Sequence, residues 1–265
     1  MSIVPALLLA VVAGLAIGIL SGMFGIGGGA MFVPLLHLLF QVPILNASAS
    51  SLLAIAPTAL SGTLRHLRQK TVNIRSALFF GIPGAAASSG SALLAGSMPS
   101  EAILALTIAV IVFCAYRVFR EALKKPIDDE GRTSKNRLKT QRGYILASIA
   151  IGLLAGFIAG LVGIGGGFII VPFGIAILGM TMKEVSAISL LAIFIIAIPG
   201  IIVHAMLGHI WYLYSIALAL GTIPGASIGV WLLSRVPERA LRFAYGFLLV
   251  FSGIMLIVNR IILGS

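Results

Sequence analysis

Long apolar runs follow one another along almost the whole chain, with only short polar breaks between them. Many of these runs approach about 20 residues, the length of a helix that crosses a hydrocarbon core of about 30 Å. They do not alternate polar with apolar positions, as the strands of a membrane β-barrel do. The pattern therefore predicts an all-α, polytopic integral membrane protein. The expected segments are roughly 3–23, 28–42, 46–66, 74–96 and 101–120, then 143–162, 166–181, 184–206, 211–234 and 238–262.

The segments at 28–42 and 166–181 are short for complete spans, and each contains a proline. Each is either a short span or the return arm of a re-entrant hairpin, and the sequence leaves both readings open. The count of membrane segments is accordingly about 8 to 10. The N-terminal run has no positively charged start and no cleavage site, so we expect it to be the first membrane segment and not a removable signal.

The chain contains an internal repeat. The pentapeptide Gly-Ile-Gly-Gly-Gly occurs at Gly25–Gly29 and again at Gly163–Gly167, inside the aligned stretches GLAIGILSGMFGIGGGAMFVP and GLLAGFIAGLVGIGGGFIIVP. The register continues without a gap, so that Ser48 aligns with Ser186 and His66 with His204. Internal repeats whose helices are interrupted by glycine at matching positions are typical of transporters, and they mark the binding site.

Charge is concentrated between the two copies of the repeat. The net charge is +11, and nine of the eighteen Lys and Arg residues lie in 117–142. This divides the chain into a first membrane repeat (1–120), a basic linker (121–142) and a second membrane repeat (143–265). A basic loop of this length is expected in the cytoplasm, and it gives no reason to expect nucleic-acid binding.

Equivalent loops of the two halves carry opposite charge patterns. The loop at 65–75 holds four basic residues, whereas its counterpart at 205–210 holds none. The next pair reverses this, because 96–100 has no basic residue and 235–242 has three. Placing every basic loop in the cytoplasm makes the two repeats inverted, each with an odd number of crossings. Both termini are then expected on the non-cytoplasmic side.

The glycine pentapeptides are candidate anion-binding loops. Glycine accepts positive φ and lets other atoms approach its backbone, and three glycines before an apolar helix leave N–H groups free at its positive end. Two such loops meeting near the midplane would enclose one small anion. The candidate binding residues are Gly25, Gly27, Gly28, Gly29, Gly163, Gly165, Gly166 and Gly167. The alternative is close helix packing, the role expected for two small-xxx-small series, Gly14, Gly18 and Gly22 and the equivalent Gly152, Gly156 and Gly160.

Further polar residues lie within the apolar segments. Hydroxyls of Ser48 and Ser186 donate hydrogen bonds without bringing charge into lipid, so they are secondary candidates for the pathway, unless they bond back to their own helices. His66 and His204 are candidates for proton coupling to the anion. With inverted repeats they are expected near opposite membrane surfaces, where the alternative is an interfacial helix end.

Several function classes are disfavoured by what the sequence lacks. No Asp or Glu lies inside an apolar segment, whereas cation sites and proton relays in membranes usually contain carboxylates. The glycine loops lack the Gly-Lys-Ser/Thr ending of a nucleotide-binding loop. There is one cysteine and no protease-like constellation. We therefore expect no enzyme activity, no metal site and no cofactor.

The duplicated GxGGG motif, the Val-Pro that follows it, the serine cluster downstream and the basic central loop together resemble the TauE/SafE family of membrane permeases. The resemblance covers nearly the whole chain. It implies transport of a small sulfur-containing anion, such as sulfite or an organosulfonate, across the cytoplasmic membrane. It does not carry over the identity of the anion.

The sequence thus predicts a secondary transporter of a small sulfur oxyanion, working by alternating access in the cytoplasmic membrane. The expected partners are this anion and the lipid bilayer. A passive anion channel and a membrane subunit without transport activity remain the alternatives. The sequence leaves open the exact anion, the direction of transport, the coupling ion and whether the protein is a homo-oligomer.

The charge pattern makes a topological prediction. In a background with Cys114 replaced by serine, single cysteines at Ser134 and Gly208 should react with a membrane-impermeant maleimide from opposite sides, Ser134 from the cytoplasm. Labelling of both from one side would disprove the inverted arrangement and the odd number of crossings in each half.

Overall fold

The computed structural model describes residues 3–122 and 141–263, and over these ranges it contains helices and no strand. Most of the predicted 121–142 linker lies outside the described residues. The helices are α1 (Ile3–Phe24), α2 (Gly29–Phe40), α3 (Ile44–Arg68), α4 (Ile74–Ala95), α5 (Ser100–Ala122), α6 (Gln141–Val162), α7 (Gly167–Ala176), α8 (Met182–Met206), α9 (Tyr212–Leu233) and α10 (Glu238–Leu263).

The all-α membrane architecture predicted from the apolar runs is confirmed. Among the described residues, six helices are long and apolar enough to cross a membrane, namely α1, α3, α4, α6, α8 and α9. Each predicted segment corresponds to one helix, but the boundary at 166–181 was wrong, because α7 already ends at Ala176. The chain then turns through Gly179, whose φ of 72° is left-handed, before α8 begins.

The two short helices follow the glycine loops. α2 has 12 residues and α7 has 10, which correspond to rises of about 18 Å and 15 Å. Neither length crosses a hydrocarbon core of about 30 Å. Each short helix therefore starts at a glycine loop inside the bundle and reaches only part of the way through it.

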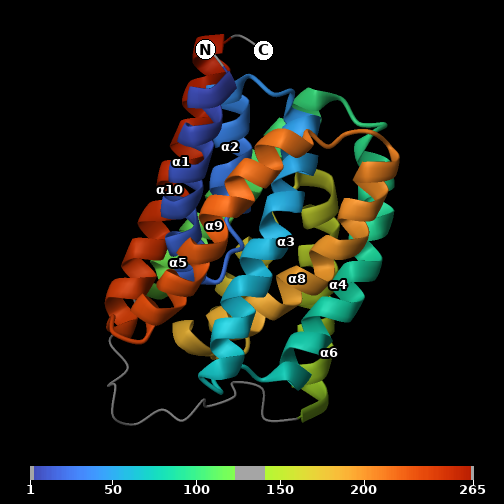
Figure 1. Cartoon of the computed structure of the whole chain (residues 1–265). Coiled ribbons are helices and arrows are strands. Elements are labelled where there is room, and N and C mark those ends of the chain that lie inside the picture. The colour runs from blue at the N-terminus through green and yellow to red at the C-terminus, as the bar shows by residue number, and fades with distance from the viewer. Residues whose placement is uncertain (1–2, 123–140, 264–265) are drawn as a thin grey trace.

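The halves run in opposite directions along the long axis of the bundle. In Figure 1 α1 begins and α10 ends at the upper end, while α6 begins at the lower end. This arrangement supports the expectation of inverted repeats, and their orientation across a bilayer stays a prediction.

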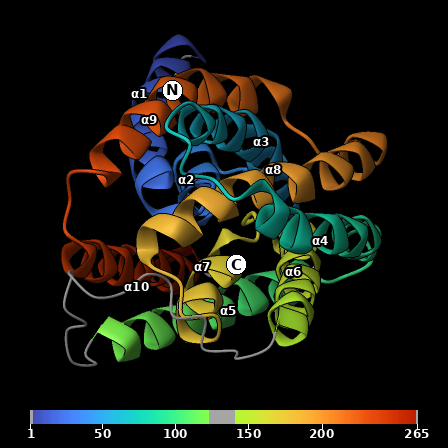
Figure 2. The same cartoon turned by 90° about the horizontal axis from the view of Figure 1, so that it is seen from below.

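Helix packing follows the repeat. α1 packs along α9, and its counterpart α6 packs along α4, while α3 contacts α8 and both are largely buried. Figure 2 shows α5 and α10 side by side at one edge of the bundle, where they also contact each other. The glycines of α1 and α6 permit these close crossings: a Cβ at Gly18 would meet the α9 backbone at Thr222, and one at Gly156 would collide with that of Gly84. The packing role expected for the small-xxx-small series is therefore confirmed.

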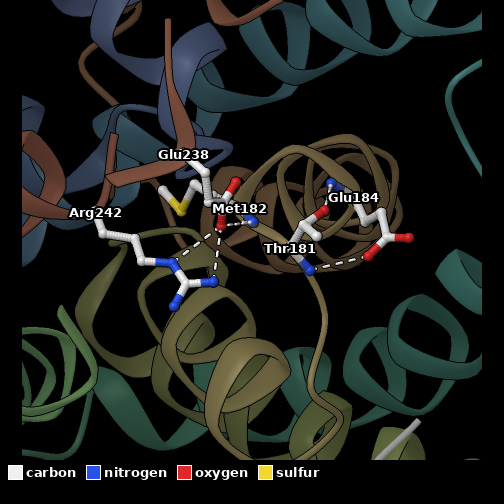
Figure 3. A network of polar contacts seen from close by, with 5 residues as sticks. All are labelled: Thr181, Met182, Glu184, Glu238 and Arg242. Carbon is white, nitrogen blue, oxygen red and sulfur yellow. Dashed lines mark hydrogen bonds and ion pairs between the residues drawn. The ribbon is translucent and has the colours of Figure 1, made fainter. Parts of the chain in front are cut away.

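Polar contacts at the lower end fix where α8 begins (Figure 3). Thr181 and Glu184 form a capping box, in which each side chain bonds the other residue's backbone N–H. Glu238, the first residue of α10, accepts a 2.6 Å hydrogen bond from the Met182 N–H. It also forms a salt bridge with Arg242. A side chain that accepts hydrogen bonds from the first N–H groups of a helix stabilises that helix. Here the bond from Met182 to Glu238 also links α8 to α10.

Candidate functional site

The two glycine loops lie against each other in the interior. A Cβ on Gly29 would collide with the Ile164 backbone, and one on Gly167 would lie 2.7 Å from the Ile26 Cα. Every residue of Gly25–Gly29 and Gly163–Gly167 is buried. The structure thus brings together the eight glycines that the repeat singled out.

The loops adopt backbone conformations that favour glycine. Gly28 and Gly166, which precede α2 and α7, are left-handed N-caps with φ of 87° and 53°. The other left-handed loop glycines are Gly25 (69°), Gly27 (74°), Gly163 (70°) and Gly165 (78°). Residues with a Cβ rarely adopt these angles, so the conformation of each loop depends on its glycines.

Both loops contain buried N–H donors without an acceptor. Within the described part of the chain, the N–H groups of Ile26, Gly27 and Gly28 donate to no backbone or side-chain oxygen, and the same holds for Ile164, Gly165 and Gly166. A buried unpaired N–H is rare in folded proteins and costs about 1–3 kcal/mol. Each loop therefore contains three buried backbone N–H groups that the described residues leave unpaired.

Each loop is hydrogen-bonded to one serine of the other repeat. The Ser51 hydroxyl of α3 lies 2.5 Å from the Gly163 carbonyl oxygen, and the Ser189 hydroxyl of α8 lies 2.5 Å from that of Gly25. Both serines are fully buried. These reciprocal hydrogen bonds hold the first loop to the second repeat and the second loop to the first.

Ser48 and Ser186 also lie at the loops, but they differ in their contacts. Ser48 lies against Gly163, and its buried hydroxyl has no hydrogen-bond partner among the described residues. The Ser186 hydroxyl is 3.4 Å from the Met23 carbonyl oxygen, a long bond. Ser48 therefore adds a free hydroxyl donor beside the second loop, and Ser186 does so less clearly.

Sequence reasoning assigned no role to a pair of isoleucines that contact both loops. A Cβ on Gly27 would lie 3.0 Å from the Ile55 side chain and 3.1 Å from that of Ile193. Both isoleucines are fully buried, near the middle of α3 and α8. A signal was present, because the pentapeptide Ser-Leu-Leu-Ala-Ile ends at each of them, at equivalent places in the repeat. They surround the loops with apolar side chains in this conformation.

The two histidines lie near the C-terminal ends of α3 and α8, and His204 contacts α6 three residues before the second glycine loop. His66 Nδ1 is 2.7 Å from the Thr71 hydroxyl. His204 Nε2 is 3.1 Å from the Gly160 carbonyl oxygen, and its Nδ1 is 3.3 Å from Nδ1 of His209. His209, which the sequence analysis did not single out, aligns with Thr71 in the repeat. His209 is partly exposed and His204 is buried, so His209 lies nearer the protein surface.

Comparison with known proteins decides the family. The family model described as "Sulfite exporter TauE/SafE" matches residues 10–256, nearly the whole chain including both glycine loops. This chain belongs to the TauE/SafE family. The resemblance noted from the repeated motif is thereby confirmed.

Several curated relatives of this TauE/SafE protein are similar over nearly their whole length. "Probable membrane transporter protein YunE" of Bacillus subtilis is 28% identical over 95% of this chain and 97% of the relative. "Probable membrane transporter protein YjnA" of the same organism is 29% identical over 92% and 97%. "Probable membrane transporter protein MJ0441" of Methanocaldococcus jannaschii is 26% identical over 94% and 95%. No solved structure matches the chain significantly. Family and relatives indicate a multi-pass membrane transporter.

The loop geometry of this TauE/SafE protein predicts a graded effect of glycine substitution. Gly163 and Gly208 both have φ of 70°, but a Cβ on Gly163 would collide with the Ser48 carbonyl, whereas one on Gly208 has nothing within 4 Å. Gly208→Ala should cost about 1–2 kcal/mol for the left-handed backbone alone. Gly163→Ala should cost at least about 2 kcal/mol more, because overpacking adds to it. Thermal unfolding in detergent checks this, and equal losses would contradict it.

Proposed function

We propose that this protein is a secondary transporter of a small sulfur oxyanion, such as sulfite or an organosulfonate, which binds between the two glycine loops. The observation that carries the proposal is the set of buried N–H groups without acceptors in both loops. The unpartnered Ser48 hydroxyl beside the second loop adds to it. An oxyanion accepts several hydrogen bonds at once and would satisfy donors that come from both repeats.

The charge of the site favours a small anion over a cation. Gly28 and Gly166 precede helices that start inside the bundle, and each helix N-terminus contributes roughly half a positive charge. Glu101, Glu184 and Glu238 only open their segments, so no carboxylate lies in the interior of an apolar segment to attract a cation. Two helix ends balance about one negative charge, which suits a monoanion without further help.

Alternating access accounts for the closed state of the loops. The buried isoleucines Ile55 and Ile193 pack against both loops from the two repeats. In this mechanism the anion enters from one side when one repeat moves against the other, and the isoleucine contacts separate on that side. We propose that the transporter lies in the cytoplasmic membrane with the 121–142 linker on the cytoplasmic side.

Two alternatives remain distinguishable. A passive anion channel would give single-channel currents and uptake that does not saturate with substrate. A membrane subunit without transport activity would move no anion in purified form. Saturable uptake by purified protein in liposomes favours the transporter.

The test of the site is uptake of radiolabelled sulfite into proteoliposomes. Ser48→Ala should lower uptake about tenfold or more, because it removes one hydrogen bond to a charged ligand. Gly28→Leu and Gly166→Leu should abolish it while the protein still inserts. Ser89→Ala is the matched control, since the Ser89 hydroxyl donates only to Ala85 in its own helix. Normal uptake by Ser48→Ala and by both leucine variants would show that the loops serve packing alone.

The charge balance of the site also predicts a dependence on pH. A dianion exceeds the roughly one unit of charge that two helix ends supply, so we propose that a proton on His66 or His204 accompanies it. The groups described against these rings are the Thr71 hydroxyl, the Gly160 carbonyl and His209. Uptake of a divalent oxyanion should rise with acidity on the outward side, and that of a monovalent sulfonate much less. Dianion uptake that ignores pH and is unchanged in the double variant His66→Gln/His204→Gln would rule this out.

A further inference from the structure

A groove between α3 and α9 has a polar end and an apolar end. It encloses about 270 Å³, and its α3 residues belong to the C-terminal half of that helix, which runs to the lower end of the bundle in Figure 1. Along α3 its lining runs from Pro57 through Leu60 and Leu64 to Arg65 and Arg68. The apolar part faces outward, since Leu60 is 37% exposed and Leu64 48% exposed.

Neither Arg65 nor Arg68 has an acidic partner among the described residues 3–122 and 141–263. Among these residues, the buried Nε of Arg65 has no hydrogen-bond acceptor. Other basic residues at this end are engaged: Arg242 pairs with Glu238, and the Arg235 guanidinium lies 3.7 Å from the Trp231 ring centre. A guanidinium that has no counter-ion among the described residues is suited to bind an external phosphate or carboxylate.

Hydroxyls hold the groove together without competing for that anion. The Ser61 hydroxyl donates a 2.6 Å hydrogen bond to the Ile223 carbonyl of α9. Since its proton is used there, the Ser227 hydroxyl is the donor in the 2.9 Å bond between the two serines. Both protons are engaged inside the groove, so recognition of an anion falls to the two arginines.

We propose that this groove binds an anionic phospholipid, with its phosphate on Arg65 and Arg68 and an acyl chain along Pro57, Leu60 and Leu64. The rise of α3 from Pro57 to Arg68 is about 16 Å, close to half of a hydrocarbon core of about 30 Å. The apolar side of the groove is thus about as long as one leaflet is thick. Its two arginines would lie at the level of the lipid headgroups. Basic pockets between helices on the cytoplasmic side are suited to anionic headgroups.

The repeat provides an internal comparison. The positions equivalent to Arg65 and Arg68 in the second half are Val203 and Met206, and neither carries charge. Met206 is 82% exposed. The groove's cations therefore belong to one end of the molecule alone, the end with the basic loops, as a site for one leaflet requires.

The test is lipid retention by the purified full chain, measured by native mass spectrometry with phosphatidylglycerol and phosphatidylcholine of the same acyl composition. The wild type should retain phosphatidylglycerol in preference. Arg65→Gln/Arg68→Gln should reduce that preference about thirtyfold, as expected for two basic residues at an anionic surface. Arg75→Gln is the matched control, because this arginine is at the same end but its guanidinium lies near the Phe79 ring, 6.0 Å away. It should change the preference less than about twofold.

Two outcomes would overturn the proposal. One is a double variant that keeps the preference for phosphatidylglycerol while unfolding at the wild-type temperature in phosphatidylcholine. The other is measured in phosphatidylcholine, where inorganic phosphate or sulfite would raise the unfolding temperature of the wild type but not that of the double variant. That result would make the groove a site for free anions. Arg65→Lys/Arg68→Lys, which keeps both charges, should keep the lipid preference in a folded protein. The readout is lipid binding, so it is independent of whether the loops transport sulfite.

Discussion

The structure depends on satisfying backbone polar groups where no water is available. Irregular backbone at membrane depth is tolerated only where it is buried in protein or lines a cavity, and both glycine loops are irregular and buried. The hydroxyls of Ser51 and Ser189 supply donors to the Gly163 and Gly25 carbonyls from the opposite repeat. The carbonyls of the loops are thereby fixed, while several of their N–H groups stay unpaired. Unpaired backbone donors at the centre of the molecule are the feature on which the proposed anion site rests.

Much of this architecture could be predicted from sequence, because a membrane helix has a simple signature in length and hydrophobicity. The repeat identified the two glycine loops, and their positive φ angles follow from the absence of a Cβ. The end of α7 could not be predicted in the same way, since the residues from Ile177 to Met180 are as apolar as a helix requires. That boundary is set by the turn at Gly179 and by the cap that Thr181 gives α8.

The contacts across the repeats were harder to predict. The shared Ser-Leu-Leu-Ala-Ile sequence indicated equivalence of Ile55 and Ile193, but only the packed structure shows that both reach Gly27. Ser48 and Ser186 are equivalent by sequence, yet only Ser48 has a hydroxyl without a partner. His204 meets His209 where His66 meets Thr71. Duplication therefore predicts position, whereas the chemistry of each position depends on how the two copies have diverged.

The reciprocal serine bonds have a consequence for how the protein is made. Ser189 lies 164 residues after Gly25 in the chain, so the first loop is synthesised and inserted long before its donor exists. Until the second half leaves the ribosome, the Gly25 carbonyl has to be hydrated or shielded by the insertion machinery. The first half is thus an incomplete folding unit, and its assembly ends only after the last helices have entered the bilayer.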